Sequence, residues 1–103
     1  MSSAQIIVTQ AGGAIAFGSV GAGYGTALAV TGTVRKLIFA STLDQECVVS
    51  LDGGTTNWMV FPANFTLTID LNPDMQYSGT ISVKHNGVAP LSGKFIVAVI
   101  RTT

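Results

Sequence analysis

Residues 48–71 carry the clearest pattern of apolar and polar positions in the chain, and this pattern predicts three strands. The apolar run at residues 48–51 is followed by a turn with two glycines, which supply the positive φ angles that turns need. Residues 58–61 form another apolar run, which Pro62 ends. Apolar and polar residues then alternate from residue 65 to residue 71, the period of a strand with one face in a core and the other in water.

Further strands are predicted on both sides of this stretch. Residues 34–42 and 79–84 have the composition and alternation of strands, and residues 94–101 (KFIVAVIR) are apolar on both faces, which predicts a central strand. Asn72-Pro73-Asp74 predicts a break, and His85-Asn86-Gly87 predicts a turn. The sequence therefore predicts an all-β fold: a single small antiparallel β-sandwich, jelly-roll-like, of about seven or eight short strands.

The first third of the chain has a different composition, because no charged residue occurs from Met1 to Val34. We expect residues 1–33 to be a Gly/Ala-rich N-terminal arm with one or two short strands, and residues 34–103 to be the β-sandwich domain. Residues 11–30 are long enough to suggest a transmembrane helix, but six glycines there oppose a helix and no Lys or Arg lies upstream. The glycine spacing also lacks the strand, helix and GK[ST] context of a phosphate-binding loop.

The charge balance excludes several classes of partner. Five basic residues equal five acidic residues, so the chain has no cationic excess for nucleic acid or for an anionic membrane. Only 10% of residues are charged, against about 25% in a typical globular protein. Either another protein covers much of the surface, or Ser, Thr and Asn side chains keep it soluble.

Candidate chemistry is sparse. Cys47 lies in an apolar run without a basic neighbour and is expected to be a buried structural thiol. His85 is the only histidine and is expected in a solvent-exposed turn, without a nucleophile and an acid arranged around it. The few carboxylates do not cluster as metal ligands. We therefore expect no enzyme activity and predict no catalytic, cofactor-binding or metal-binding residues.

The order of several short motifs resembles small structural proteins of tailed bacteriophages, of the capsid decoration or cement type. The resemblance extends from about Leu37 to Ile100 and is carried by Val48–Gly54, Phe61–Ala63, Leu67–Leu71, Ile81–Gly87 with Pro90, and Ser92–Gly93. It implies a β-sandwich that binds across seams between major capsid subunits, often as a trimer at local three-fold positions. It also implies a place in the virion after synthesis in the host cytoplasm, with the major capsid protein or other virion proteins as partners.

We expect the protein interface to include residues of the glycine-rich arm and of the aromatic run, namely Gly21, Gly23, Tyr24, Trp58 and Phe61. Two alternatives remain. One is another virion component, such as a tail, head-tail connector or fibre-base protein. The other is a carbohydrate-binding β-sandwich module in which Trp58 and Tyr77 stack on a sugar, although Trp58 is flanked by apolar residues and is expected in a core or a subunit interface.

Overall fold

A computed structural model describes residues 9–101, with side chains described except at 9–12, 31–33, 71–78 and 101. This part of the chain forms six strands and one short 3-10 helix. In chain order they are β1 (Thr9–Ala16), η1 (Phe17–Ser19), β2 (Gly25–Ser41), β3 (Cys47–Ser50), β4 (Met59–Phe61), β5 (Phe65–His85) and β6 (Lys94–Arg101).

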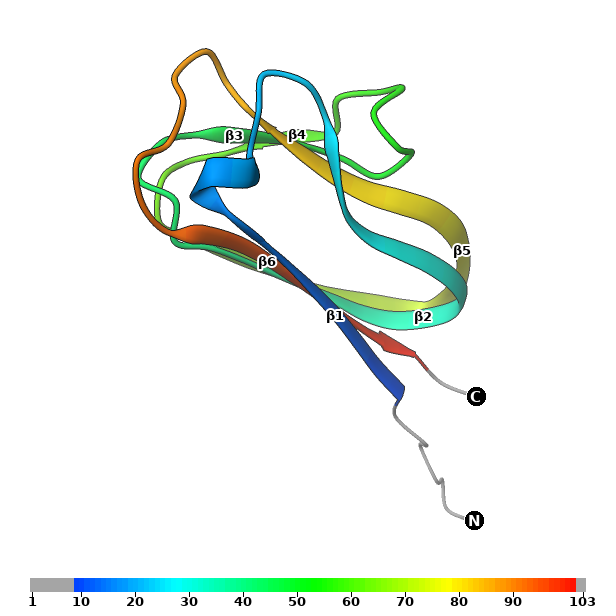
Figure 1. The fold of residues 1–103 in the computed structure, drawn as a ribbon. Coiled ribbons are helices and arrows are strands. Elements are labelled where there is room, and N and C mark those ends of the chain that lie inside the picture. Colours follow the sequence, from blue (N-terminus) through cyan, green and yellow to red (C-terminus); the bar gives the residue numbers. More distant parts are fainter. Residues whose placement is uncertain (1–8, 102–103) are drawn as a thin grey trace.

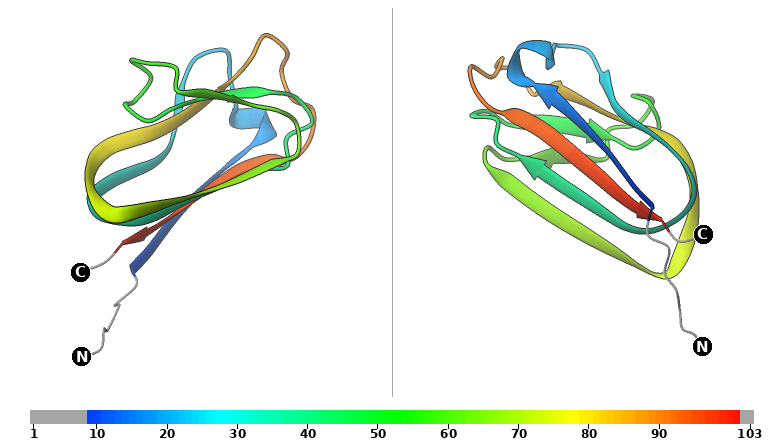
Figure 2. Two further views of the ribbon diagram at one scale, coloured as in Figure 1. Left: turned by 180° about the vertical axis from the view of Figure 1, so that it is seen from behind. Right: turned by 60° about the horizontal axis from the view of Figure 1, so that its bottom comes forward.

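The six strands form one continuous antiparallel sheet in the order β1-β6-β2-β5-β3-β4, and this sheet folds over on itself (Figure 1). The long strands β2 and β5 run through both layers as a curved pair. The β6 layer consists of β1, β6, the second half of β2 and the first half of β5. The β3 layer consists of the remaining halves of β2 and β5 with β3 and β4, so each layer has four strand segments, and Figure 2 shows both layers from further sides.

The pairing is nested: β1 pairs with β6, β2 with β5, and β3 with β4. With each long strand divided at its bend, the segments pair first with last and so on inward, which is the eight-strand scheme of a jelly roll. The predicted all-β sandwich of jelly-roll type is therefore confirmed. The expected seven or eight short strands are present as segments, four of which are joined in pairs into two long strands.

The bend lies where the sequence predicts a break. Pairing of β2 with β5 shifts register between Val34 and Lys36, and on β5 it is interrupted between Asp70 and Met75. Asn72-Pro73-Asp74 falls in that interruption, so the breaker turns β5 from one layer into the other but does not end it. An irregularity in a strand increases its local bend and twist, as a sheet corner requires.

Residues 9–33 are integral to the sandwich, and in this the structure differs from the expected division at residue 34. β1 pairs with β6 along its whole length, and residues 25–34 of β2 pair with β5. The boundary expected between arm and domain therefore falls inside β2. Gly13 explains part of this placement, because a Cβ there would lie 2.0 Å from the carbonyl oxygen of Ala27, so only glycine allows β1 to approach β2 so closely. The first of the short strands expected in the arm, at Gln5–Thr9, lies outside the described residues except for Thr9, which begins β1.

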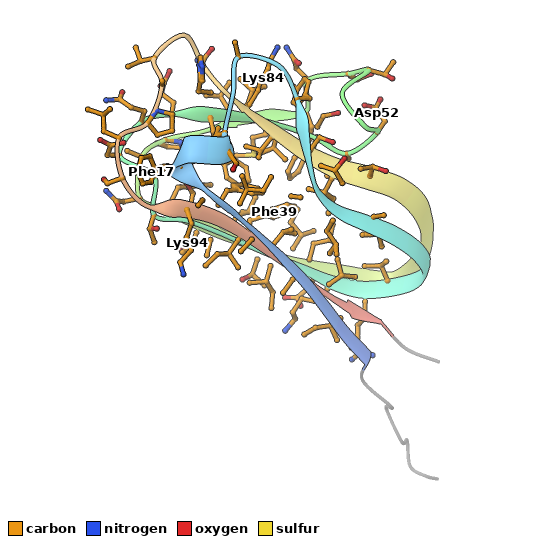
Figure 3. All side chains as sticks on the ribbon, in the orientation of Figure 1. Phe17, Phe39, Asp52, Lys84 and Lys94 are labelled. Atoms are coloured by element: carbon orange, nitrogen blue, oxygen red, sulfur yellow. The ribbon has the colours of Figure 1, made fainter. Side chains whose placement is uncertain are left out.

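Aromatic rings fill the space between the layers. Phe39 of β2, Phe61 of β4 and Phe95 of β6 are 0% exposed, and the Phe39 ring centroid lies 5.4 Å from that of Phe61 and 6.3 Å from that of Phe95. Figure 3 shows Phe39 between the two layers. Alternation places Val97 and Val99 of β6 on the same side, also 0% exposed. The core thus joins strands from both layers into one hydrophobic unit.

Within residues 9–101, the structure contains no helix that is long and apolar enough to cross a membrane.

Candidate functional site: an uncovered apolar sheet face

The outer face of the β6 layer is formed by isoleucine and alanine side chains. β6 directs Phe95, Val97 and Val99 into the core, so Ile96, Ala98 and Ile100 point outward. Strand pairing places residues of β1 and β2 beside them. We call this surface the Ile/Ala face; its members are Ala14, Ala16, Ile38, Ala40, Ile96, Ala98 and Ile100, which are all exposed or partly exposed.

Charged groups lie only at the margins of the Ile/Ala face. Lys36 Nζ lies 3.3 Å from Asp70 Oδ1 at one margin, and this ion pair is cross-strand, because Lys36 and Asp70 are register partners. Lys94 begins β6 at the opposite margin and is exposed, and Figure 3 shows it pointing away from the sandwich. The centre is free of charge among the described side chains, as in the buried core of a protein interface.

The outer face of the β3 layer is different, because the chain covers part of it. Val48, Ser50 and Ser82 point away from the core, yet they are only 4%, 0% and 2% exposed. The loop of residues 51–57 folds back beside Ser50, whose hydroxyl accepts from the Gly54 N–H, and its Gly53 N–H donates to the carbonyl oxygen of Thr80 at 2.9 Å. The chain therefore covers part of this outer face, where Val60 is still 45% exposed, whereas the Ile/Ala face has no such cover within the described residues.

A hydrogen-bonded turn shapes the covering loop. The Ser50 hydroxyl donates to Asp52 Oδ1 at 2.7 Å and accepts from the Gly54 N–H at 2.9 Å. Asp52 Oδ1 also accepts from the Thr56 N–H at 2.8 Å. These donors, the Ser50 hydroxyl first and the Thr56 N–H next, stabilise the carboxylate and lower the pKa of Asp52 from 3.8 to about 2. The turn predicted at residues 52–54 is thus ordered by a charged side chain.

Acid should loosen this loop. Because the pKa of Asp52 is lower in the folded than in the unfolded chain, its stabilising contribution is complete above about pH 4 and is lost as the pH falls through about 2. NMR titration of the Asp52 carboxyl carbon should give a midpoint near pH 2, and Ser50→Ala should raise that midpoint. An unchanged midpoint in Ser50→Ala would show that the hydroxyl does not hold the carboxylate.

Tyr24, directly before β2, contacts the same loop of residues 51–57. Its hydroxyl donates to Asn57 Oδ1 at 2.5 Å, and its ring lies over Gly54, where a Cβ would come within 3.0 Å of Tyr24 Cδ2. Lys84 of β5 places its ammonium group 4.7 Å from the centroid of the Tyr24 ring. Burial and, to a smaller degree, the negative charge of Asp52 raise the pKa of Tyr24. Tyr24 therefore has internal partners on several sides.

The residues expected at the interface occupy different environments. Gly21 and Gly23 are exposed in the loop before β2, and the Gly21 carbonyl accepts from the His85 N–H at 3.0 Å. Phe61 is 0% exposed and belongs to the core. Trp58 is 37% exposed, and its ring centroid lies 6.1 Å from that of Phe61. None of the five lies on the Ile/Ala face.

Trp58 lies at the boundary between core and solvent. Its ring also packs on Phe39, with 5.5 Å between the ring centroids, while the rest of the indole faces water. The side chain of Tyr77, the second residue of the sugar-stacking alternative, lies outside the described side chains. Trp58 is therefore accessible at the surface, and the stacking of Trp58 and Tyr77 on a sugar stays a prediction.

The side chains of Cys47 and His85 are fully and partly buried, respectively. Cys47 is 0% exposed, and burial raises the pKa of its thiol to about 11, as a structural thiol requires. His85 ends β5 and is partly buried, with Nδ1 enclosed and without a hydrogen-bond partner in the described part of the chain. The expectation of a solvent-exposed turn histidine was wrong, because β5 continues to residue 85. Across the described residues, no three His, Cys, Asp or Glu side chains group as metal ligands.

Comparison with known proteins gives a structural neighbour. No protein-family model matches the sequence, and no curated protein matches it either. A solved structure from Bacillus endospore appendages, which form disulfide-linked pili, superimposes with a TM-score of 0.55 and 14% sequence identity. The match covers 99% of this chain and 94% of the appendage chain. At this identity the similarity extends to the fold.

Proposed function

We propose that this chain is a structural virion protein of a tailed phage, which decorates or cements the capsid by binding across seams between major capsid subunits. The observation that carries the proposal is the uncovered Ile/Ala face on a jelly roll with few charged residues. Jelly rolls are common among viral capsid domains, which raises the prior for this function without determining it. The motif order from about Leu37 to Ile100 resembles such phage proteins.

The size of the Ile/Ala face bears on how the protein binds. From strand spacing and rise, the face measures roughly 400 Å². A stable two-protein interface needs about 800 Å² on each partner, so this face alone gives weak binding. A symmetric shell compensates, because many linked contacts bind much more tightly than one. We further propose a trimer, as the resemblance to decoration proteins implies; a trimer bound to the repeated subunits of a virion has that multiplicity.

Incorporation into phage particles tests the proposal. Quantitative mass spectrometry of purified virions should find hundreds of copies per particle, whereas a connector would give about a dozen by symmetry. Ile38→Asp places a charge on the Ile/Ala face and should abolish incorporation, since an unpaired buried charge is strongly unfavourable. The matched control is Val60→Asp, because Val60 is 45% exposed on the β3 layer and should tolerate the charge. If mass spectrometry found no copies of the wild-type chain in purified virions, the proposal would be overturned.

A second candidate function is suggested by the structural neighbour: a subunit of a pilus-like fibre. The match over nearly the whole of both chains favours it. A disulfide-linked fibre is disfavoured, because Cys47 is the only cysteine and is buried. Electron microscopy of the concentrated protein with and without reductant distinguishes the candidates: fibres that dissolve in reductant favour a disulfide-linked pilus, whereas discrete rings favour the virion protein.

A further inference from the structure

The first half of β5 is a sheet edge with which no further strand of the described chain pairs. Residues 65–70 pair with β2 on one side, and in the right-hand view of Figure 2 this yellow-green segment forms the outer margin of the β6 layer. In an edge strand, every second residue directs its backbone N–H and C=O groups away from the sheet. These groups are available to pair with a strand of another chain.

The other edges of the described sheet are short or face each other. β4 has three residues and ends before Pro62. β1 and the first half of β2 approach each other closely, since a Cβ on Gly13 would clash with the carbonyl oxygen of Ala27. Proteins protect exposed edges with lysine, proline or a bulge, and residues 65–70 contain none of these. The edge of β5 is therefore the one long edge of the described sheet that is open to another chain.

Apolar side chains along this edge are only partly covered. Phe65, Leu67 and Ile69 pack against the hydrophobic core, yet each remains partly exposed, because no described strand lies beyond them. Thr66 and Thr68 alternate with them and are exposed on the outer face, where strand pairing places them beside the Ile/Ala face. A further strand at this edge would complete the burial of the three apolar side chains.

The edge is complementary to itself. When two copies meet antiparallel about a two-fold axis at Leu67, Phe65 lies opposite the partner's Ile69, and threonine lies opposite threonine. This register places apolar side chains against apolar side chains, as a sheet with one buried face requires. Asp70, the only charged residue of the edge, lies outside the paired segment and forms an ion pair with Lys36 of its own chain. No like charges therefore oppose the contact.

Pairing of the two edges also joins the two Ile/Ala faces. The β6 layers of both copies become one eight-stranded sheet, and both outer faces lie on the same side, because the two-fold axis is perpendicular to the sheet. One Ile/Ala face measures roughly 400 Å², whereas each partner of a standard interface contributes about 800 Å². Two faces side by side therefore provide the area that one copy lacks for stable binding to a capsid.

We propose that residues 65–69 of β5 pair with the same residues of a second copy, as antiparallel strands about a two-fold axis at Leu67. The contact is isologous, because both chains use the same edge. Main-chain hydrogen bonds supply the attraction, as in other cases of strand addition to a sheet edge. The inference deepens the proposed function and rests on it only for the role of the Ile/Ala face. On a shell, two-fold axes relate neighbouring three-fold positions, so the same contact would link one trimer to the next.

Charge complementation in the full chain tests this pairing by sedimentation velocity. Thr66→Lys with Thr68→Lys places like charges opposite each other across the two-fold axis, and Thr66→Glu with Thr68→Glu does the same with the opposite sign. At millimolar concentration, the wild type should sediment with at least twice the mass of either double variant. An equimolar mixture of the two variants should restore the wild-type mass, because lysine then faces glutamate.

The matched control adds two lysines to the opposite edge of the same layer. Ala14→Lys with Ala16→Lys has the same spacing along β1, and Ala14 lies in the same cross-strand row as Thr66, through Ile96 and Ala40. Both alanines are exposed, so this variant should fold and associate as the wild type does. Loss of association in the control would show that copies meet through their Ile/Ala faces and would overturn the edge pairing.

A wild-type chain with the same mass as the double lysine variant would overturn the pairing, as would a mixture that does not regain mass. If a β5 variant fails to fold by circular dichroism, NMR of mixed labelled and unlabelled wild-type chains replaces it. Contacts between Thr66 and Thr68 of different chains are then expected, and an associated sample without them would reject the pairing. Association of the purified chain without copies in virions keeps the pairing and rejects the phage function. Copies in virions of a chain that does not associate when purified reject the pairing and keep the phage function.

Discussion

Replacing Phe39 with alanine should lower the free energy of unfolding by about 3–5 kcal/mol, the range for truncating a buried phenylalanine. The ring is 0% exposed and contacts the rings of Trp58, Phe61 and Phe95. Truncation removes contacts to both layers at once and leaves a cavity that the paired strands cannot close. Because a domain of this size has a total stability of about 5–15 kcal/mol, this loss is a large share of it.

Urea unfolding followed by tryptophan fluorescence measures this effect directly, since Trp58 packs on the deleted ring. Val88→Ala removes apolar atoms from a side chain that is 56% exposed and serves as the control, with an expected change within about 0.5 kcal/mol. A loss below about 1 kcal/mol for Phe39→Ala would contradict the buried aromatic arrangement, because a cavity of that size always costs more. Should the variant not fold, Phe39→Leu keeps most of the volume and gives a smaller, measurable loss.

Strands with a strong local signal were predictable from the sequence. The apolar run at residues 94–101 coincides with β6, which lies between β1 and β2 as a central strand. Residues 58–61 contain β4, which ends before Pro62. The alternation predicted over residues 79–84 agrees with the burial of Ile81 and Val83, which are 0% and 1% exposed. In each case the residues of the segment itself determine the alternation of the strand or the position at which it ends.

Long-range pairing was not predictable in the same way. Asn72-Pro73-Asp74 signals a break, but whether the chain reverses there or bends depends on β2, whose own irregularity at Val34 faces it. β1 has a weak strand signal, since Gly12 and Gly13 disfavour strands, and its place depends on the close approach of Gly13 to Ala27. Both features are properties of two segments together.

The Ile/Ala face had a signal that was interpreted differently. An apolar pattern on both faces of residues 94–101 predicted a central strand, and pairing with β1 and β2 confirms this position. Sequence alone does not show that one side of this strand meets the core while the other meets nothing in the same chain. By contrast, Tyr24 and Phe61 were predicted to lie in the protein interface, and in the structure both contact residues of their own chain.

Gly93→Ala should be the second severe substitution, with a loss of about 2–6 kcal/mol. The backbone at Gly93 has a φ of 91°, which costs an alanine about 1–3 kcal/mol. The new Cβ would also lie 2.0 Å from the carbonyl oxygen of Thr42 and 2.8 Å from the backbone nitrogen of Leu43. These atoms belong to backbone that is held by a hydrogen bond from the Thr42 N–H to the Lys94 carbonyl at 2.8 Å, so relief requires separation of the two segments. Crowding of this kind adds about 1–3 kcal/mol.

Gly87→Ala separates the two causes, because Gly87 has almost the same φ, 88°, with nothing within 4 Å of the added Cβ. We expect it to cost about 1–2 kcal/mol through backbone strain alone. The difference between the two variants in urea unfolding then measures the steric term at Thr42. Equal losses would mean that the chain between β2 and β6 relaxes freely around residue 93.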